Sequence, residues 1–229
     1  MGERFFLSGP PRAGRAVLTG DEARHLARVL RCRIGDTVVA FDGSGVEWPA
    51  VVAAIGRDEV ALDVGDAVER PGPAVAVTIA VALPKGERQK WLVEKLTELG
   101  VARLVPLITT RGVAEATPAA VERLARGVIE ACKQCGRDTL MEIAPPRSVA
   151  EIARDPGHGV TLVVADRDGL PLDTSAGDGR SIIAVVGPEG GLTAEELAAV
   201  EAAGGRRVSL GPHVLRVETA AIALAARWV

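Results

Sequence analysis

The chain contains 229 residues, of which 48% are hydrophobic and 25% are charged, and its formal net charge is −3. This composition is typical of a soluble globular protein, and the slightly acidic balance argues against a general polyanion-binding protein. No apolar run is long enough to span a membrane, and residues 1–4 lead into no signal-like segment. We therefore expect a cytoplasmic protein without membrane contact.

The first part of the chain, residues 1–70, is expected to form a small β-barrel domain. A helix is expected from a capping box of Thr19 and Glu22 to about Leu30, and Asp42-Gly43 is a strong turn signal. Short strands separated by tight turns are typical of small barrels. The expected strands cover 4–7, 37–41, 46–55 and 59–64.

Charge is distributed unevenly along this domain. Residues 1–33 carry seven arginines against three acids, whereas residues 34–69 carry one arginine against eight acids. The basic segment fits contact with phosphates, and a solvated charged surface is the alternative.

After a linker at 69–73, the pattern changes to alternating strands and helices over residues 71–229. Such an alternation predicts an open α/β domain with a parallel sheet. A loop is expected over 166–180, and a short helix begins at a capping box of Ser148 and Glu151. The expected strands cover 75–83, 101–108, 160–165, 181–186 and 206–210, and the other expected helices cover 87–99, 118–135 and 218–228.

The three cysteines give no evidence for a metal or disulfide site. Cys132 and Cys135 form a C-x-x-C pair, but no second pair exists to complete a zinc site. The pair lies near the end of the helix expected over 118–135, whereas a redox pair would lie at a helix N-terminus. Core packing is the favoured interpretation, and an odd cysteine count fits a reducing compartment.

Two glycine turns form the candidate site. The first, Gly187–Gly191, follows a buried strand and precedes a helix with a capping box of Thr193 and Glu196; the second contains Gly211 and follows the strand at 206–210. Backbone N–H groups without a hydrogen-bond partner at such turns can bind a carboxylate or the polar edge of a cofactor. The spacing matches neither a dinucleotide-binding fingerprint nor a P-loop. A connection that binds no ligand is the alternative.

The residues of these turns closely resemble the ribosomal RNA small subunit methyltransferase E family. The matching segments, in order, are HLARVLR (25–31), KLTELG (95–100), Gln134 with Arg137, GPEGG (187–191), LG (210–211) and LRVETA (215–220). Cys135 departs from the family, which more often has a small hydroxyl residue there. The resemblance covers nearly the whole chain.

The resemblance implies a SPOUT-type, S-adenosylmethionine-dependent methyltransferase acting on uracil N3 in small-subunit (16S) ribosomal RNA. It implies a PUA-like RNA-binding barrel, a deep trefoil knot in the C-terminal domain and a homodimer. The substrate would be free ribosomal RNA or the assembled 30S particle. The alternatives are a SPOUT enzyme that modifies a transfer RNA base or ribose, an RNA-binding or ribosome-assembly protein without catalysis, and more remotely an unrelated nucleotide-binding α/β protein.

The resemblance also implies roles for single residues. For catalysis we expect Arg216 to stabilise charge on the uracil oxygens, and Glu218 or Glu189 to accept the proton or orient the cofactor. Each glutamate is alternatively an acid at a helix N-terminus. The expected cofactor contacts are Gly187, Gly190, Gly191, Leu210, Gly211 and Leu215. The expected RNA contacts are Arg4, His25, Arg28, Arg31, Gln134 and Arg137, of which His25 is the one more often structural. No metal site is expected.

Overall fold

The structure, a computed structural model, describes residues 2–113, 116–172 and 181–228. The chain divides into two compact units. The N-terminal unit contains Met1–Gly72 and Ile129–Leu140, and the C-terminal unit contains Pro73–Val128 and Met141–Val229. Each unit is described separately below.

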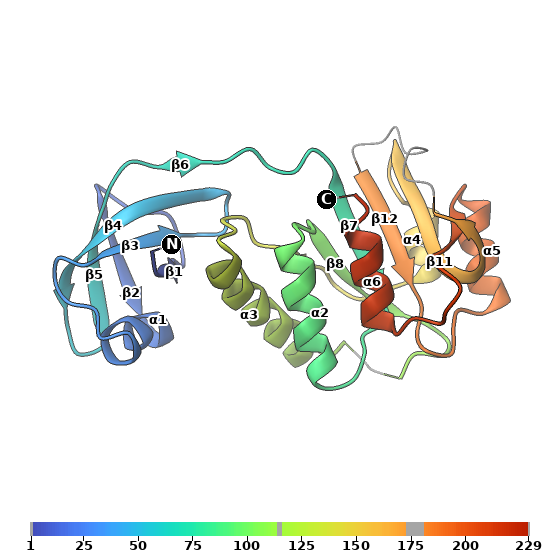
Figure 1. Cartoon of the computed structure of the whole chain (residues 1–229), viewed down its shortest axis with the longest axis horizontal. Coiled ribbons are helices and arrows are strands. Elements are labelled where there is room, and N and C mark those ends of the chain that lie inside the picture. Colours follow the sequence, from blue (N-terminus) through green and yellow to red (C-terminus); the bar gives the residue numbers. More distant parts are fainter. Residues whose placement is uncertain (1, 114–115, 173–180, 229) are drawn as a thin grey trace. The chain divides into compact units, whose positions relative to one another are not determined.

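The N-terminal unit is built on a curled sheet (Figure 1). Its strands lie in the order β1-β3-β4-β5-β2, with β6 paired to β4; the β1–β3 pair is parallel and the other pairs are antiparallel. A register shift between Val52 and Ala54 interrupts the pairing of β4 with β5, and such a bulge bends a strand. The strands are β1 (Arg4–Phe6), β2 (Arg15–Thr19), β3 (Thr37–Phe41), β4 (Val46–Ile55), β5 (Glu59–Val64) and β6 (Val68–Glu69).

The expected strands at 37–41, 46–55 and 59–64 are confirmed, and that at 4–7 ends one residue early. The strand β2 was missed, although its alternating burial places Ala16 and Leu18 in the core. The sequence does not show this alternation, because the exposed position between Ala16 and Leu18 is occupied by another apolar residue, Val17.

The capping box expected at Thr19 is wrong. The helix there is short, α1 (Gly20–Arg24), and it continues into a π-helix, η1 (His25–Val29). Thr19 is the N-cap residue but makes no side-chain cap hydrogen bond. The Glu22 carboxylate instead accepts from the Phe6 backbone N–H at 3.1 Å and pairs with Lys133 at 2.7 Å. Glu22 therefore ties the helix to β1 and to the end of another helix.

That other helix is α3 (Pro118–Cys135), whose predicted bounds are confirmed. Its residues from Ile129 onward belong to the N-terminal unit. Cys132 is fully buried, and burial raises the pKa of its thiol to about 12, which fits core packing and not redox chemistry.

The C-terminal unit contains a parallel sheet with strand order β10-β8-β7-β12-β11-β13, and β9 pairs with β8. All of its strand pairs are parallel, which confirms the expected α/β class. The strands are β7 (Ala76–Val81), β8 (Arg103–Ile108), β9 (Glu142–Ile143), β10 (Arg147–Ser148), β11 (Val160–Pro171), β12 (Ser181–Val186) and β13 (Arg206–Ser209).

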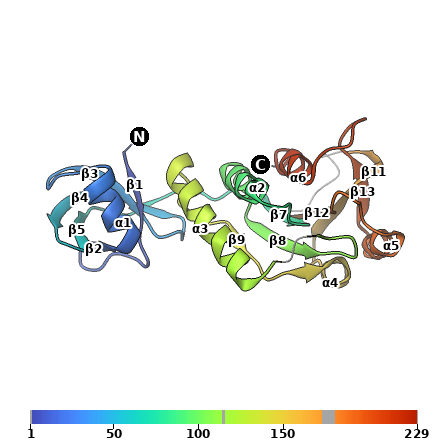
Figure 2. The ribbon, with the colours of Figure 1, turned by 90° about the horizontal axis from the view of Figure 1, so that it is seen from below.

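Helices cover both faces of this sheet (Figure 2). The helices α2 (Glu87–Glu98) and α6 (Val217–Ala225) pack together on one face, and α4 (Val149–Arg154) and α5 (Ala194–Ala202) pack together on the other. The expected capping boxes at Ser148 and Thr193 are both confirmed. The last helix ends at Ala225, three residues before the expected bound.

The loop expected over 166–180 is wrong in its first part. The strand β11 continues to Pro171, with a register shift against β13 between Ala165 and Leu170. The rest of the expected loop, 173–180, lies outside the described residues.

Candidate active site

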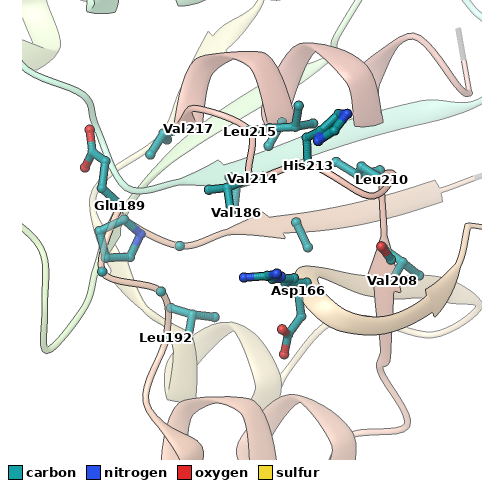
Figure 3. A pocket seen from close by; sticks show the side chains of 18 of the residues that line it. Asp166, Val186, Glu189, Leu192, Val208, Leu210, His213, Val214, Leu215 and Val217 are labelled. Atoms are coloured by element: carbon teal, nitrogen blue, oxygen red, sulfur yellow. The ribbon is translucent and has the colours of Figure 1, made fainter.

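The two glycine turns lie at the same edge of the parallel sheet. They follow β12 and β13, which both pair with β11 and run in the same direction. In open α/β sheets, this carboxyl-terminal edge is where ligands bind. A cavity of about 330 Å³ lies between the turns, and Figure 3 shows its walls coming from β11, β13, the turn after β12 and the segment before α6.

All six residues expected to contact a cofactor line this cavity. They are Gly187, Gly190, Gly191, Leu210, Gly211 and Leu215. The structure therefore brings together two sequence segments that are about twenty residues apart. Their role in cofactor binding stays a prediction.

Close approach of the backbone to a side chain requires glycine in the first turn. A Cβ atom at Gly187 would lie 2.9 Å from Cγ of Leu192, another cavity residue. Gly191 has φ of +71°, in the left-handed region that favours glycine, and its N–H donates to the Pro188 carbonyl at 2.8 Å. The turn is thus closed by its own backbone.

The three residues expected to be catalytic occupy different environments. Glu189 is exposed and lines the cavity. Arg216 is the N-cap residue of α6, just before the cavity residue Val217, and it is exposed. Glu218 is only 4% exposed and is not among the residues that line the cavity.

Sequence reasoning missed several cavity residues, of which Asp166 and Arg167 carry charge. Asp166 is paired with Arg207, whose Nη2 lies 2.6 Å from Oδ2. Arg167 is exposed, so the cavity is lined by a cation with access to solvent. The signal that could have found them is their place directly after a buried parallel strand, which the sequence did predict.

The residues expected to bind RNA in the N-terminal unit fall into two groups. Arg4 is 7% exposed; its Nη1 lies 2.5 Å from Glu47 Oε2, and its guanidinium lies 5.0 Å from the Phe41 ring centroid. That charge is neutralised inside the unit. Arg28 and Arg31 are exposed, and His25 is half-buried with its ring 6.4 Å from that of Phe5.

Gln134 lies at the end of α3 and Arg137 lies two residues after it, both within the N-terminal unit. Gln134 is exposed. Arg137 is half-buried; burial lowers the pKa of its guanidinium, against the opposing effects of Cys132, Cys135 and Asp138. The Arg137 carbonyl accepts a hydrogen bond from Arg4 at 3.3 Å.

In the part of the chain that the structure describes, no three His, Cys, Asp or Glu side chains gather in a way that could hold a metal ion. Within the same residues, no helix is both long and apolar enough to cross a membrane.

Comparison with known proteins identifies the class of this fold and site. A family model described as an RNA methyltransferase domain matches residues 71–229, and one described as an RNA methyltransferase PUA domain matches residues 18–65. The chain thus has the domains of an RNA methyltransferase.

The chain belongs to the ribosomal RNA small subunit methyltransferase E family. The protein of that name from Mycobacterium bovis is 34% identical over 228 residues, covering 95% of this chain and 87% of the relative. That from Bacillus subtilis is 29% identical and covers 89% of this chain and 85% of the relative.

Solved structures agree with this assignment. The ribosomal RNA small subunit methyltransferase E from Neisseria gonorrhoeae, bound to S-adenosyl methionine, has a TM-score of 0.90 and 28% identity, with 99% of this chain and 96% of that chain covered. A methyltransferase from Legionella pneumophila in complex with the same cofactor has a TM-score of 0.85 and 28% identity, with the same coverage.

Proposed function

We propose that this protein is an S-adenosylmethionine-dependent methyltransferase that modifies N3 of a uridine in 16S ribosomal RNA. The observation that carries the proposal is the cavity enclosed by the two glycine turns at the carboxyl ends of β12 and β13. Family membership supports methyl transfer to ribosomal RNA. The choice of uracil N3 comes from the sequence resemblance.

The residues of the cavity fit the cofactor. Its volume of about 330 Å³ lies within the range of small-molecule sites, roughly 300–1,000 Å³. Glycines let a ligand lie against the main chain, and the leucines at 192, 210 and 215 offer an apolar wall. When bound, S-adenosylmethionine supplies a methyl group activated by its sulfonium.

The protein's own residues would position the uracil and manage its proton. Loss of the N3 proton leaves negative charge on O2 and O4, and we assign Arg216, beside the cavity, to stabilise that charge. We assign Glu189, on the cavity wall, to accept the proton or to hold the cofactor's ammonium group. Glu218 is buried, so we assign it a supporting role in place of proton transfer.

For RNA contact we propose Arg28 and Arg31, which are exposed, together with Gln134 at the end of α3 and Arg137 just after it. His25 is half-buried and Arg4 is buried, so both are assigned to packing within the N-terminal unit. This unit would act as a PUA-like RNA-binding barrel. We retain 1–70 and 71–229 as the functional domains.

A deep trefoil knot in the C-terminal domain and a homodimer are also part of the proposal. Both come from the resemblance. Light scattering measures the dimer directly, and a monomer at micromolar concentration would contradict it.

In the deciding experiment, the protein is incubated with labelled S-adenosylmethionine and small ribosomal subunits that lack this modification. The methylated nucleosides are then identified. Free 16S RNA runs in parallel. We expect 3-methyluridine in subunits or free RNA, and its loss with Arg216→Ala. Arg154→Ala, which removes an exposed arginine at the end of α4, is the matched control.

Two outcomes would contradict parts of the proposal. A different methylated nucleoside, or methylation of transfer RNA alone, would favour another SPOUT reaction. Cofactor binding without methylation of any RNA would favour an assembly protein.

A further inference from the structure

Two arginines outside the cavity hold the first glycine turn. Arg88, near the start of α2, and Arg111, after β8, both contact the turn at 187–191, and neither is among the residues that line the cavity. They come from segments that are far from the turn in sequence. Neither arginine was singled out by the sequence.

Arg111 fixes the backbone of the turn. Its Nη1 donates to the Gly190 carbonyl at 2.8 Å, and a Cβ at Gly190 would lie 3.5 Å from Cδ of Arg111, so the side chain also packs over the turn. The peptide unit between Gly190 and Gly191 is planar, with its C=O and N–H pointing in opposite directions. Because that N–H donates to Pro188, Arg111 and Pro188 hold this peptide unit from both sides.

Arg88 fixes the side chain of the turn and links it to α6. Its Nη1 donates to Glu189 Oε1 at 3.2 Å and lies 3.6 Å from Oε2 of Glu218, in the first turn of α6. That oxygen is buried and has no hydrogen-bond partner among the described residues. A buried carboxylate that lacks a hydrogen bond depends on its nearby cation. Arg88 thus contacts both Glu189, on the cavity wall, and the buried Glu218 carboxylate.

We propose that Arg88 and Arg111 are positioning residues that clamp the 187–191 turn in its cofactor-binding form. Arg111 orients the backbone of the turn, and Arg88 holds Glu189 and joins the turn to the start of α6. Arg88 thereby holds two walls of the cavity, the first turn and the segment that leads into α6, in a fixed relative position, although its own side chain does not line the cavity. The inference rests on the proposed function, since it is about the affinity for S-adenosylmethionine.

The test measures the Kd of S-adenosylmethionine by calorimetry for the full-length protein and for Arg88→Met and Arg111→Met. Methionine keeps much of the aliphatic chain and removes the charge and the donors. We expect each variant to bind about tenfold more weakly, the size of one missing charge-assisted hydrogen bond. For Arg111→Met, which leaves the contacts of Glu189 in place, we expect KM for the cofactor to rise while kcat at saturating cofactor stays within about threefold.

Conservative and control variants separate positioning from general stability. Arg88→Lys and Arg111→Lys each keep a cation that can donate hydrogen bonds, so each should retain part of the affinity that the methionine variant loses. Arg126→Met removes an exposed arginine of α3 that pairs with Glu122 on the surface, and it should leave the Kd unchanged. Arg88→Met combined with Glu218→Gln removes the unpaired buried charge, so it should restore the Tm but not the Kd.

A double-mutant cycle tests the partner of Arg88. Because Arg88 acts through Glu189, the effects of Arg88→Met and Glu189→Gln on the Kd should be strongly non-additive, whereas Arg111→Met and Glu189→Gln should be closer to additive.

Three outcomes would overturn the clamp. In the first, the wild-type protein binds S-adenosylmethionine and the Kd of both methionine variants stays within about twofold of the wild-type Kd. In the second, Arg88→Met lowers the affinity, and adding Glu218→Gln to Arg88→Met restores both the affinity and the Tm. If the wild-type protein does not bind the cofactor at all, the clamp and the proposed function both fail, whereas the first two outcomes leave the proposed function intact.

Discussion

At the scale of single residues, burial decides what each charged side chain can do. Arg4 and Arg28 belong to the same basic segment, but Arg4 is inside the curled sheet against Glu47 and Arg28 is exposed. Glu189 and Glu218 differ in the same way around the cavity. The residue type gives the chemistry, and the environment decides whether solvent or substrate can reach it.

Gly187→Ala should abolish measurable cofactor binding or weaken it by more than about tenfold. The added Cβ would lie 2.9 Å from Leu192 Cγ, so the turn or the cavity wall must shift. Calorimetry with S-adenosylmethionine gives the Kd. Gly9→Ala, where a Cβ would meet nothing within 4 Å, is the control, and equal affinities for the two variants would contradict the steric argument.

The N-terminal unit should lose stability on acidification through Glu47. Burial raises the pKa of this carboxyl, but hydrogen bonds and charges from Arg4 and Arg70 outweigh it and hold the pKa below its ordinary value. A depressed pKa contributes stability above the unfolded-state value of about 4.3, and this contribution is lost as the pH falls through the lower folded-state value. Glu47→Gln should therefore be less stable at neutral pH and show a flatter pH dependence below about pH 4.3.

Urea unfolding followed by the fluorescence of Trp48 checks this, in a background with Trp91→Phe and Trp228→Phe. Asp63→Asn is the control, because Asp63 pairs with Arg15 at 3.5 Å on the surface, where such pairs contribute little. An unchanged pH slope in Glu47→Gln would contradict the role of this carboxylate.

At the scale of elements, one capping box connects helix α5 to the site. Glu196 Oε2 accepts from the Thr193 N–H at 2.8 Å, as a capping box requires, while its Oε1 accepts from the Thr110 N–H at 2.9 Å. Thr110 immediately precedes Arg111. The capping residue therefore also fixes the segment that holds the first glycine turn.

Thr193→Ala and Ser148→Ala should differ in their effect on cofactor affinity. Each removes the N-cap of a capping box and should cost about 1 kcal/mol of stability. Only Thr193→Ala should weaken the binding of S-adenosylmethionine, by about two- to fivefold, because α4 contributes no residue to the cavity. The Tm and the Kd are measured together, and equal loss of affinity in both variants would contradict the prediction.

At the scale of the whole molecule, charge is unevenly distributed along the chain, so the dependence of RNA affinity on salt concentration is an informative measurement. The chain carries a net charge of −3, so attraction to RNA must come from local groups such as the arginines within residues 1–33. Neutralising phosphates releases counterions, which gives a linear fall of log K with log salt concentration.

Arg28→Gln combined with Arg31→Gln should reduce the salt slope of RNA binding by roughly 1.5, about 0.7 to 0.9 for each phosphate that is no longer neutralised. Fluorescence anisotropy with a labelled fragment of 16S RNA, at several salt concentrations, gives the slope. Arg126→Gln, on the exposed side of α3, is the control. An unchanged slope in the double variant would show that these arginines do not bind phosphates.

The sequence by itself determined the elements of the C-terminal unit and the segments that form its site. Apolar runs predicted its main strands, Thr193 and Glu196 marked the start of α5, and glycine spacing singled out both turns, because these signals are local. Only the tertiary structure placed β11 between β12 and β13, buried Arg4 and brought Arg88 and Arg111 to the first turn. Strand order and burial depend on interactions between segments far apart in the chain, and no local pattern carries that information.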